Sequence, residues 1–457
     1  MTLTRFARTS AHDRDRGGWI HNVDPILASR ESTVQAESRV FRLQRSRPWL
    51  AKTGRIAKMN GSREQPNGDV MSVSTPDRTL SANDHAQTMA DYIAEGTERA
   101  YDIGNRGPIR RNADGKLASD ILDAYWEHGF YVFEGVVDDV ELAELRADVE
   151  RMLDGAPADP KSDRDSQGRR ALCQQFTRPP YRFAKPLSDP LGGTDLYKGR
   201  HPAKMHEATP AADAPTWTVQ NLHGNLQLMD TTLRLYGHPG LLAIAEAVLG
   251  PDFVPYNEVT FLKEPGLGPS VAWHQDGTTH WDSPDWDHGA HGFNFMTQLY
   301  PSTAANSVWI LPGSHKQGKV DIRQMMKDAG SDRIAGAMPL LCDTGDTFML
   351  NRQVVHGSFA NTSAERRVTL NAGFFPRRRV QDMTVEHLDG RVVTFDDAHI
   401  HERSRMIAIG VDARRQRFPD EASYRYQPLA AEVDENRWNE ATRESVVKNY
   451  NLRDMYI

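Results

Sequence analysis

The stretch VAWHQDG, residues 271–277, carries the strongest indication of fold and chemistry in this chain of 457 residues. Its first three residues are apolar, which is typical of a short strand buried in a sheet. Side chains two positions apart on a strand point to the same face, so His274 and Asp276 would present an imidazole and a carboxylate to one point. This pattern predicts that one strand supplies two ligands to a metal ion.

A second histidine follows another predicted strand. Residues 345–349, GDTFM, predict a turn that leads into an apolar strand, and His356 lies shortly after it in VVHGS. Two histidines and one carboxylate on one face of an octahedral ion leave three positions open, which suits non-haem Fe(II) oxygenases. We therefore predict a metal site formed by His274, Asp276 and His356.

An arginine eleven residues after His356 adds a second feature. Arg367 opens the β-like run 367–375, and a guanidinium held beside a metal suits a dicarboxylate cosubstrate, because Arg binds a carboxylate through two parallel hydrogen bonds. A slip of one residue would exchange Arg367 with Arg366, but the spacing favours Arg367. Asn371 shares the face of Arg367 by alternation, so we expect it to line the substrate cavity.

Short apolar runs separated by Gly and Pro turns fill the second half of the chain, at 256–263, 270–275, 292–300, 306–311, 346–350 and 366–375. Helical periodicity precedes these runs at 84–101, 117–125 and 239–249. A further helix is expected to begin after Asp138, which can cap it. Many short strands at close spacing are typical of a jelly roll. We predict a mainly β fold with flanking helices, built on a double-stranded β-helix core of the jelly-roll, cupin-like kind.

The N-terminal part of the chain is basic, whereas the rest is acidic. Residues 1–58 hold 12 Lys and Arg against 5 Asp and Glu, whereas the whole chain has a net charge of −7. The predicted organisation is a basic, disordered extension and linker over 1–83, a helical lead-in over 84–112, a dioxygenase domain over 113–430 with an irregular insertion at 155–220, and a tail over 431–457.

The same arithmetic excludes several classes of function. The body after residue 58 is acidic, which argues against nucleic-acid binding, because phosphates would be repelled. Apolar runs long enough to span a bilayer are lacking, so no membrane span is expected. Only Cys173 and Cys342 are present, without a Cys-x-x-Cys pair, which favours a reducing, cytoplasmic setting.

Taken in order, these motifs resemble the phytanoyl-CoA dioxygenase family of Fe(II)- and 2-oxoglutarate-dependent oxygenases. The resemblance covers residues 115–380. It is carried by YWEHGFYV at 125–132, His274-x-Asp276, ILPGSH at 310–315, HGS at 356–358, and Arg367.

The resemblance implies a set of roles and a reaction. The Fe(II) ligands would be His274, Asp276 and His356, and the 2-oxoglutarate contacts would be Arg367, Ser358 and Gln298. The reaction would use O₂ to hydroxylate an unactivated C–H bond of a small-molecule or acyl substrate, releasing succinate and CO₂, with ascorbate as reductant in vitro. Desaturation and cyclisation are alternative outcomes.

Two other classes of function use the same residues. A zinc hydrolase could use the same three ligands with a bound water, and a metal-free binding module could use the same scaffold. Arg367 argues against the hydrolase, because hydrolysis needs no grip on a dicarboxylate.

The substrate is open at this stage, as is the oligomeric state. The loop 281–291, rich in Trp and His, is expected to shape the substrate pocket. For an acyl-CoA substrate, Lys198, Arg200 and Lys204 could provide a basic groove for its phosphates.

Overall fold

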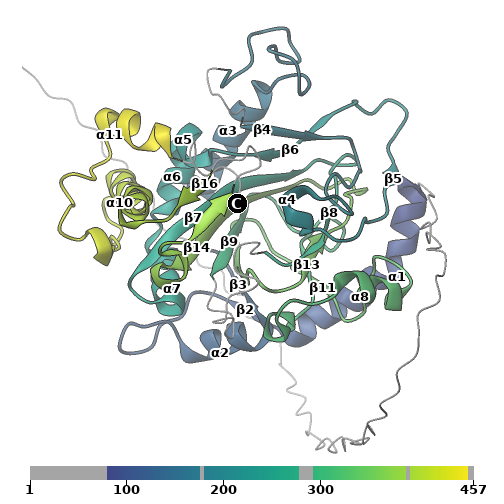
Figure 1. Cartoon of the computed structure of the whole chain (residues 1–457), viewed down its shortest axis with the longest axis horizontal. Coiled ribbons are helices and arrows are strands. Elements are labelled where there is room, and N and C mark those ends of the chain that lie inside the picture. The colour runs from purple at the N-terminus through teal and green to yellow at the C-terminus, as the bar shows by residue number, and fades with distance from the viewer. Residues whose placement is uncertain (1–79, 175–179, 277–291, 387–391, 451–457) are drawn as a thin grey trace, which may run out of the picture. The chain divides into compact units, whose positions relative to one another are not determined.

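The computed structural model describes residues 80–174, 180–276, 292–386 and 392–450, and two sheets dominate it (Figure 1). The larger sheet has the strand order β2 (Arg106–Gly107), β3 (Phe130–Phe133), β12 (Thr347–Asn351), β9 (Phe293–Gln298), β14 (Arg367–Pro376), β7 (Phe253–Lys263), β6 (Thr218–Leu222), β4 (Tyr181–Ala184). The smaller sheet has the order β11 (Met338–Pro339), β10 (Trp309–Ile310), β13 (His356–Ser358), β8 (Val271–His274). Pairing is antiparallel throughout both sheets except between β2 and β3.

This architecture confirms the predicted jelly-roll class with flanking helices, in the form of two open sheets rather than a closed barrel. A strand lies in each of the six expected runs. The run 306–311 differs most, because only Trp309–Ile310 pairs as a strand. The backbone amides of Asn306 and Ser307 both donate to the carbonyl of Thr303, so this part of the run is a turn.

Alternation along the central strands separates an apolar face from a polar one. On β9, Phe293 and Phe295 belong to the main hydrophobic core, whereas Asn294 and Met296 line a cavity. On β14, Val368 and Leu370 belong to that core, whereas Arg367, Thr369 and Asn371 line the cavity. The large sheet therefore carries its helices on one face and the candidate site on the other.

Helices cover both sheets, and Figure 1 shows α6, α7 and α10 beside the large sheet and α1 and α8 beside the small one. These helices are α6 (Asp230–Tyr236), α7 (Pro239–Leu249), α10 (Asp397–Arg417), α1 (Ala82–Ile103) and α8 (Ile322–Ala329). On α1, Tyr92 stacks on Trp309 of the small sheet with ring centroids 4.6 Å apart. At Gly96 of α1, a β-carbon would come within 2.5 Å of the same indole, so this helix lies very close to the sheet.

The remaining elements are short or lie at the edges. They are α2 (Ser119–His128), α3 (Asp139–Asp154), α4 (Leu196–Gly199), α5 (Asn225–Leu228), α9 (Arg377–Val380), α11 (Glu440–Ser445), β1 (Leu80–Ser81), β5 (Ala208–Thr209), β15 (Thr384–Glu386), β16 (Val392–Thr394) and the 3₁₀ turns Ser314–Gln317, Gln427–Leu429 and Val447–Asn449. The cap expected at Asp138 is present, since its side chain accepts a hydrogen bond from the amide of Glu141. Within the described residues, no helix is long and apolar enough to cross a bilayer.

The insertion 155–220 is more regular than its composition indicates. It contributes β4 and the start of β6 to the edge of the large sheet, next to β7. β4 has only the four residues YRFA, which is too short for a period of two to be recognised in the sequence. The insertion therefore forms one wall of the cavity.

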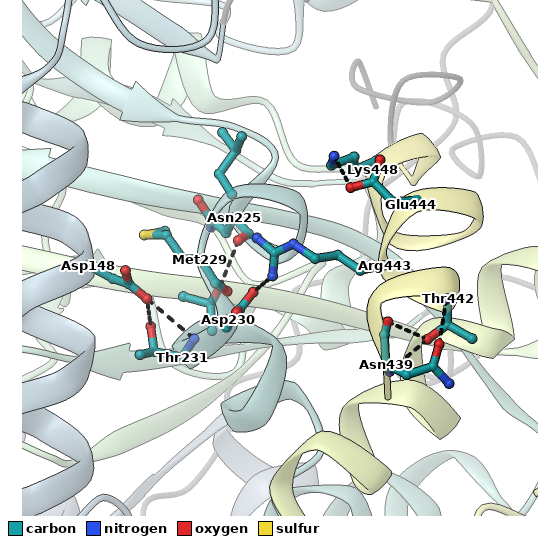
Figure 2. A network of polar contacts seen from close by, with 12 residues as sticks. Asp148, Asn225, Met229, Asp230, Thr231, Asn439, Thr442, Arg443, Glu444 and Lys448 are labelled. Carbon is teal, nitrogen blue, oxygen red and sulfur yellow. Dashed lines mark hydrogen bonds and ion pairs between the residues drawn. The ribbon is translucent and has the colours of Figure 1, made fainter. Parts of the chain in front are cut away.

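Residues near the C-terminus contact the segment α5–α6, which follows β6 in the chain (Figure 2). Arg443 of α11 forms an ion pair with Asp230 at the start of α6, as Figure 2 shows. The amide nitrogen of the Gln227 side chain donates to the carbonyl of Lys448. On the other side, the hydroxyl of Thr231 donates to a carboxylate oxygen of Asp148 in α3 over 2.8 Å. The segment α5–α6 is thus held between α3 and the C-terminal turn.

Gly129 gives a stability test of the junction between α2 and β3. Its φ is +82°, and an added β-carbon would lie 2.3 Å from Val354 and 2.7 Å from His315. Gly115 has the same φ of +82° with nothing within 4 Å. We expect Gly115→Ala to lower the free energy of unfolding by about 1–2 kcal/mol, and Gly129→Ala to lower it by about 1–3 kcal/mol more. Urea unfolding measures both, and equal losses would contradict the close packing at Gly129.

Candidate metal and cosubstrate site

One cavity of about 160 Å³ holds most of the residues that the sequence singled out. Its lining includes side chains from both sheets and from the insertion, among them all three predicted metal ligands, Arg367 and Ser358. The prediction that Asn371 lines the cavity with Arg367 is confirmed. Gln298 lies outside this lining.

His274, Asp276 and His356 converge at one end of the small sheet. Each offers a ligand atom, and these atoms lie within 4.8 Å of one another. His274 on β8 pairs directly with His356 on β13, so the two imidazole centroids are 4.1 Å apart. Asp276 lies two residues beyond His274, with its Oδ1 3.5 Å from Nε2 of His274. The three side chains can therefore hold one metal ion.

Backbone carbonyls fix the orientation of both imidazoles. Nδ1 of His274 lies 2.8 Å from the carbonyl oxygen of Ala272, and Nδ1 of His356 lies 2.9 Å from that of Val354. A carbonyl accepts only, so Nδ1 carries the proton and Nε2 keeps its lone pair for a metal. Burial lowers the pKa of His356 to about 3, with His274 as the next cause, so this ring is neutral as a ligand must be.

Asp276 remains ionised although it is buried. Burial raises the pKa of Asp276, but the charges of Arg352 and Arg200 and the contact with His274 outweigh it, so the pKa lies well below its usual value. The side-chain amide of Asn294 donates to Oδ2 of Asp276 over 3.0 Å, and Arg352 in turn donates to Asn294 over 3.0 Å. Asp276 is thus held as a carboxylate, which is the form that binds a metal.

Arg367 fits the distal carboxylate of 2-oxoglutarate. Its side chain is buried, and one nitrogen donates to the carbonyl of Asn306 over 2.7 Å while its Nε has no partner. Among the residues that the structure describes, it has no carboxylate in ion-pair contact, and burial lowers its pKa to about 10. The hydroxyl of Ser358, also in the cavity wall, is buried without a partner. A buried guanidinium with free hydrogen-bonding capacity suits an incoming anion.

Arg366 faces the other way. Its guanidinium forms ion pairs with Glu150 and Glu264 and lies over the ring of Tyr300. Its charge is therefore already compensated, and the geometry favours Arg367 as the cosubstrate residue.

Gln298 lies on the same face of β9 as Asn294 and Met296 but outside the cavity lining. Its side-chain carbonyl accepts a hydrogen bond from the hydroxyl of Thr369 over 2.9 Å, and its amide donates to the carbonyl of Met296 over 3.0 Å. Thr369 itself lines the cavity. In this arrangement Gln298 positions Thr369, and its direct contact with a cosubstrate stays a prediction.

Two residues of the insertion approach the candidate metal ligands, and sequence reasoning missed His201 and gave Arg200 a different role. His201 is buried with its Nδ1 unpartnered, and its ring centroid is 4.4 Å from that of His274. Arg200, considered for an exposed groove, points inward instead, with a nitrogen 3.2 Å from Oδ1 of Asp276. Lys198 is exposed, and Lys204 pairs with Glu207, so the three basic residues form no common groove.

Arg352 and Asn294 were also missed, for different reasons. Asn294 sits on the cavity face of a predicted strand, so alternation was a usable signal. Arg352 follows β12 in a loop, and nothing local in the sequence links it to Asp276. The loop 281–291 lies outside the described residues.

Comparison with known proteins relates this chain to a family. The family model described as "Phytanoyl-CoA dioxygenase (PhyH)" matches residues 125–369. The L-proline trans-4-hydroxylase of Streptomyces griseoviridis is 26% identical over 33% of this chain and 65% of its own length. Phytanoyl-CoA dioxygenase 1 of Oryza sativa subsp. japonica is 29% identical over 24% of this chain and 40% of its own length. The chain thus spans less than two thirds of either relative.

Among solved structures, EctD from S. alaskensis, with 2-oxoglutarate and 5-hydroxyectoine, is 16% identical, covering 60% of this chain and 82% of that one with a TM-score of 0.41. The description of the fold rests on the strand order of the chain itself.

Asn294 offers a test of how Asp276 is held. We expect Asn294→Ala to weaken Fe(II) binding by about 10- to 100-fold, because the carboxylate loses the hydrogen bond that orients it. Anaerobic metal titration measures the affinity. Asn221→Ala is the matched control, since Asn221 lines the same cavity but its side-chain nitrogen has no partner. Equal affinities for the two variants would contradict this role of Asn294.

Proposed function

This chain belongs to the phytanoyl-CoA dioxygenase family, and from that membership we propose that it is a Fe(II)- and 2-oxoglutarate-dependent dioxygenase. The observation that carries the proposal is the meeting, in one cavity, of the His274, Asp276 and His356 triad with Arg367, a buried arginine whose carboxylate partner is missing among the described residues. The triad alone would suit several metals. The arginine adds the requirement for an anionic cosubstrate.

Each residue has a definite task in this proposal. His274 and His356 offer Nε2 to the ion, while the Nδ1–H of each ring donates a hydrogen bond to a backbone carbonyl. Asp276 supplies the negative charge. Arg367 binds the distal carboxylate of 2-oxoglutarate, and Ser358 adds a hydroxyl beside it. Bound Fe(II), together with 2-oxoglutarate and O₂, supplies the oxidising power for the reaction, with succinate and CO₂ as coproducts.

Apolar side chains in the cavity wall would limit access of water to the cosubstrate. Val271, Met296 and Val308 line the cavity together with Arg367. A dry wall strengthens the ion pair between the guanidinium and the carboxylate, because the local dielectric constant is low. It also shields reactive species from side reactions.

Hydroxylation of a C–H bond is the outcome that we propose. One relative is named as an L-proline trans-4-hydroxylase and the other as a phytanoyl-CoA dioxygenase, so the names include a small molecule and an acyl substrate. The zinc hydrolase is not favoured, because it gives the buried charge of Arg367 no partner.

Succinate formation tests the proposal. Purified protein with Fe(II), 2-oxoglutarate, ascorbate and O₂ is expected to produce succinate slowly even without the organic substrate. His274→Ala should abolish it, and Arg367→Gln should raise the 2-oxoglutarate concentration needed by about tenfold or more, since a charge-assisted contact is lost.

Arg366→Gln is the matched control and should behave as the wild type, because that arginine is paired with Glu150 and Glu264. Binding of Fe(II) and 2-oxoglutarate is measured in parallel by calorimetry. If neither binds to the wild type, the proposed function is wrong, and hydrolysis with Zn²⁺ becomes the next assay.

A further inference from the structure

Two arginines of the insertion enter the cavity on the side away from Arg367. Arg182 lies on β4, and Arg200 follows α4 directly. Both guanidinium groups lie near one aromatic ring, because their central carbons are 5.3 Å and 5.4 Å from the ring centroid of Tyr197. Arg182 also donates to the hydroxyl of Tyr197. We call Arg182 and Arg200 the guanidinium pair.

The charge of the guanidinium pair is poorly compensated. Within the described part of the chain, Arg182 has no carboxylate in ion-pair contact, and the one carboxylate beside Arg200 is that of Asp276 at 3.2 Å. Asp276 is a predicted metal ligand, so a bound ion would take this partner away. Nε of Arg200 is buried and has no hydrogen-bond partner. The Arg200 side chain is largely buried, where a charge is costly unless it is paired, and Arg182 is half-buried, so this end of the cavity can receive an anion.

The backbone before Arg200 supports a dedicated role. Tyr197 has φ of +52° and Lys198 has φ of +57°, and Gly199 continues with +68°. Consecutive non-glycine residues in the left-handed region are unfavourable and persist where the surrounding structure imposes them, often at binding sites. This bend directs Arg200 and His201 into the cavity rather than toward solvent.

The sheet register places the guanidinium pair away from the cosubstrate. Arg182 pairs with Asn221, Asn221 with Phe261, and Phe261 with Thr369, so these four residues form a row across the large sheet. Three strand spacings separate Arg182 from Thr369, which is roughly 14 Å. Arg367 lies two residues from Thr369 on β14. Arg182 and Arg367 therefore enter the cavity from backbone positions three strands apart.

We infer that the guanidinium pair binds a carboxylate of the organic substrate, and that this substrate is a small free acid oxidised a few bonds from that group. The inference rests on the proposed function and specifies its substrate class. The distance from the bound carboxylate to the metal would be short, because Arg200 contacts both the Tyr197 ring and the predicted metal ligand Asp276.

Calorimetry on the full-length protein, loaded anaerobically with Fe(II) and 2-oxoglutarate, tests the inference. The probes are cyclopentanecarboxylate and benzoate, each compared with its own primary amide. We expect each acid to bind at least about tenfold more tightly than its amide, because one ionic, bidentate contact is available only to the acid. Arg182→Gln and Arg200→Gln should each remove most of that preference. Arg182→Lys, which keeps the charge but not the fork, should retain part of it.

Three outcomes separate this inference from the proposed function. If 2-oxoglutarate does not bind to the wild type, the proposed function fails. If 2-oxoglutarate binds but acids and amides bind alike, or the preference survives in both Gln variants, the inference alone is overturned. If Arg182→Gln and Arg200→Gln weaken 2-oxoglutarate as much as Arg367→Gln does, the pair serves the cosubstrate, which also overturns it. Arg366→Gln is the control, and unfolding temperatures verify that each variant is folded.

Discussion

The antiparallel pairing of β8 with β13 is the constraint on which the rest of the site depends. It sets His274 opposite His356, and a slip of one residue would turn one imidazole to the far face of the sheet. The outer face of the same strands holds the register, because Trp273 is completely buried between α1 and the small sheet and its indole nitrogen donates to the carbonyl of Asp332 over 2.7 Å. The packing of one tryptophan thus fixes the direction of its neighbouring metal ligand.

In the large sheet, too, alternating side chains point to two different faces, one packed and one lining the site. The side chains on its outer face, such as Phe295 and Leu370, pack in the hydrophobic core with the helices. The side chains on its inner face are therefore not needed for that packing. Those positions carry Arg367, Thr369 and Asn294, which are polar and lie in a cavity rather than in solvent. A site of this kind is rigid because its residues stand on strands that are packed from behind.

Much of this arrangement could be predicted from local patterns, and the limits of prediction have physical causes. The ligands, Arg367 and the class of fold follow from alternation and spacing, because these signals lie within single strands. The contact of Arg352 with Asp276 depends on two loops meeting in space, which no local period records. The role of the insertion was missed for a related reason, since the bend at Tyr197 and Lys198 uses residue types that rarely adopt positive φ.

The two arginines beside Asp276 differ in what holds them. Arg352 lies 5.2 Å from the ring centroids of both Tyr256 and Phe375 and donates to Asn294, so aromatic and neutral groups keep it in place whether or not the carboxylate is available. Among the described residues, the contacts of Arg200 are with the ring of Tyr197 and with the carboxylate itself. When a cation binds Asp276, the attraction that Arg200 feels is reduced, whereas the contacts of Arg352 with its rings and amide persist. Arg352 therefore keeps its place beside Asp276 whether or not a cation is bound, and under the proposed function Arg200 is the arginine whose charge would become available to the substrate carboxylate.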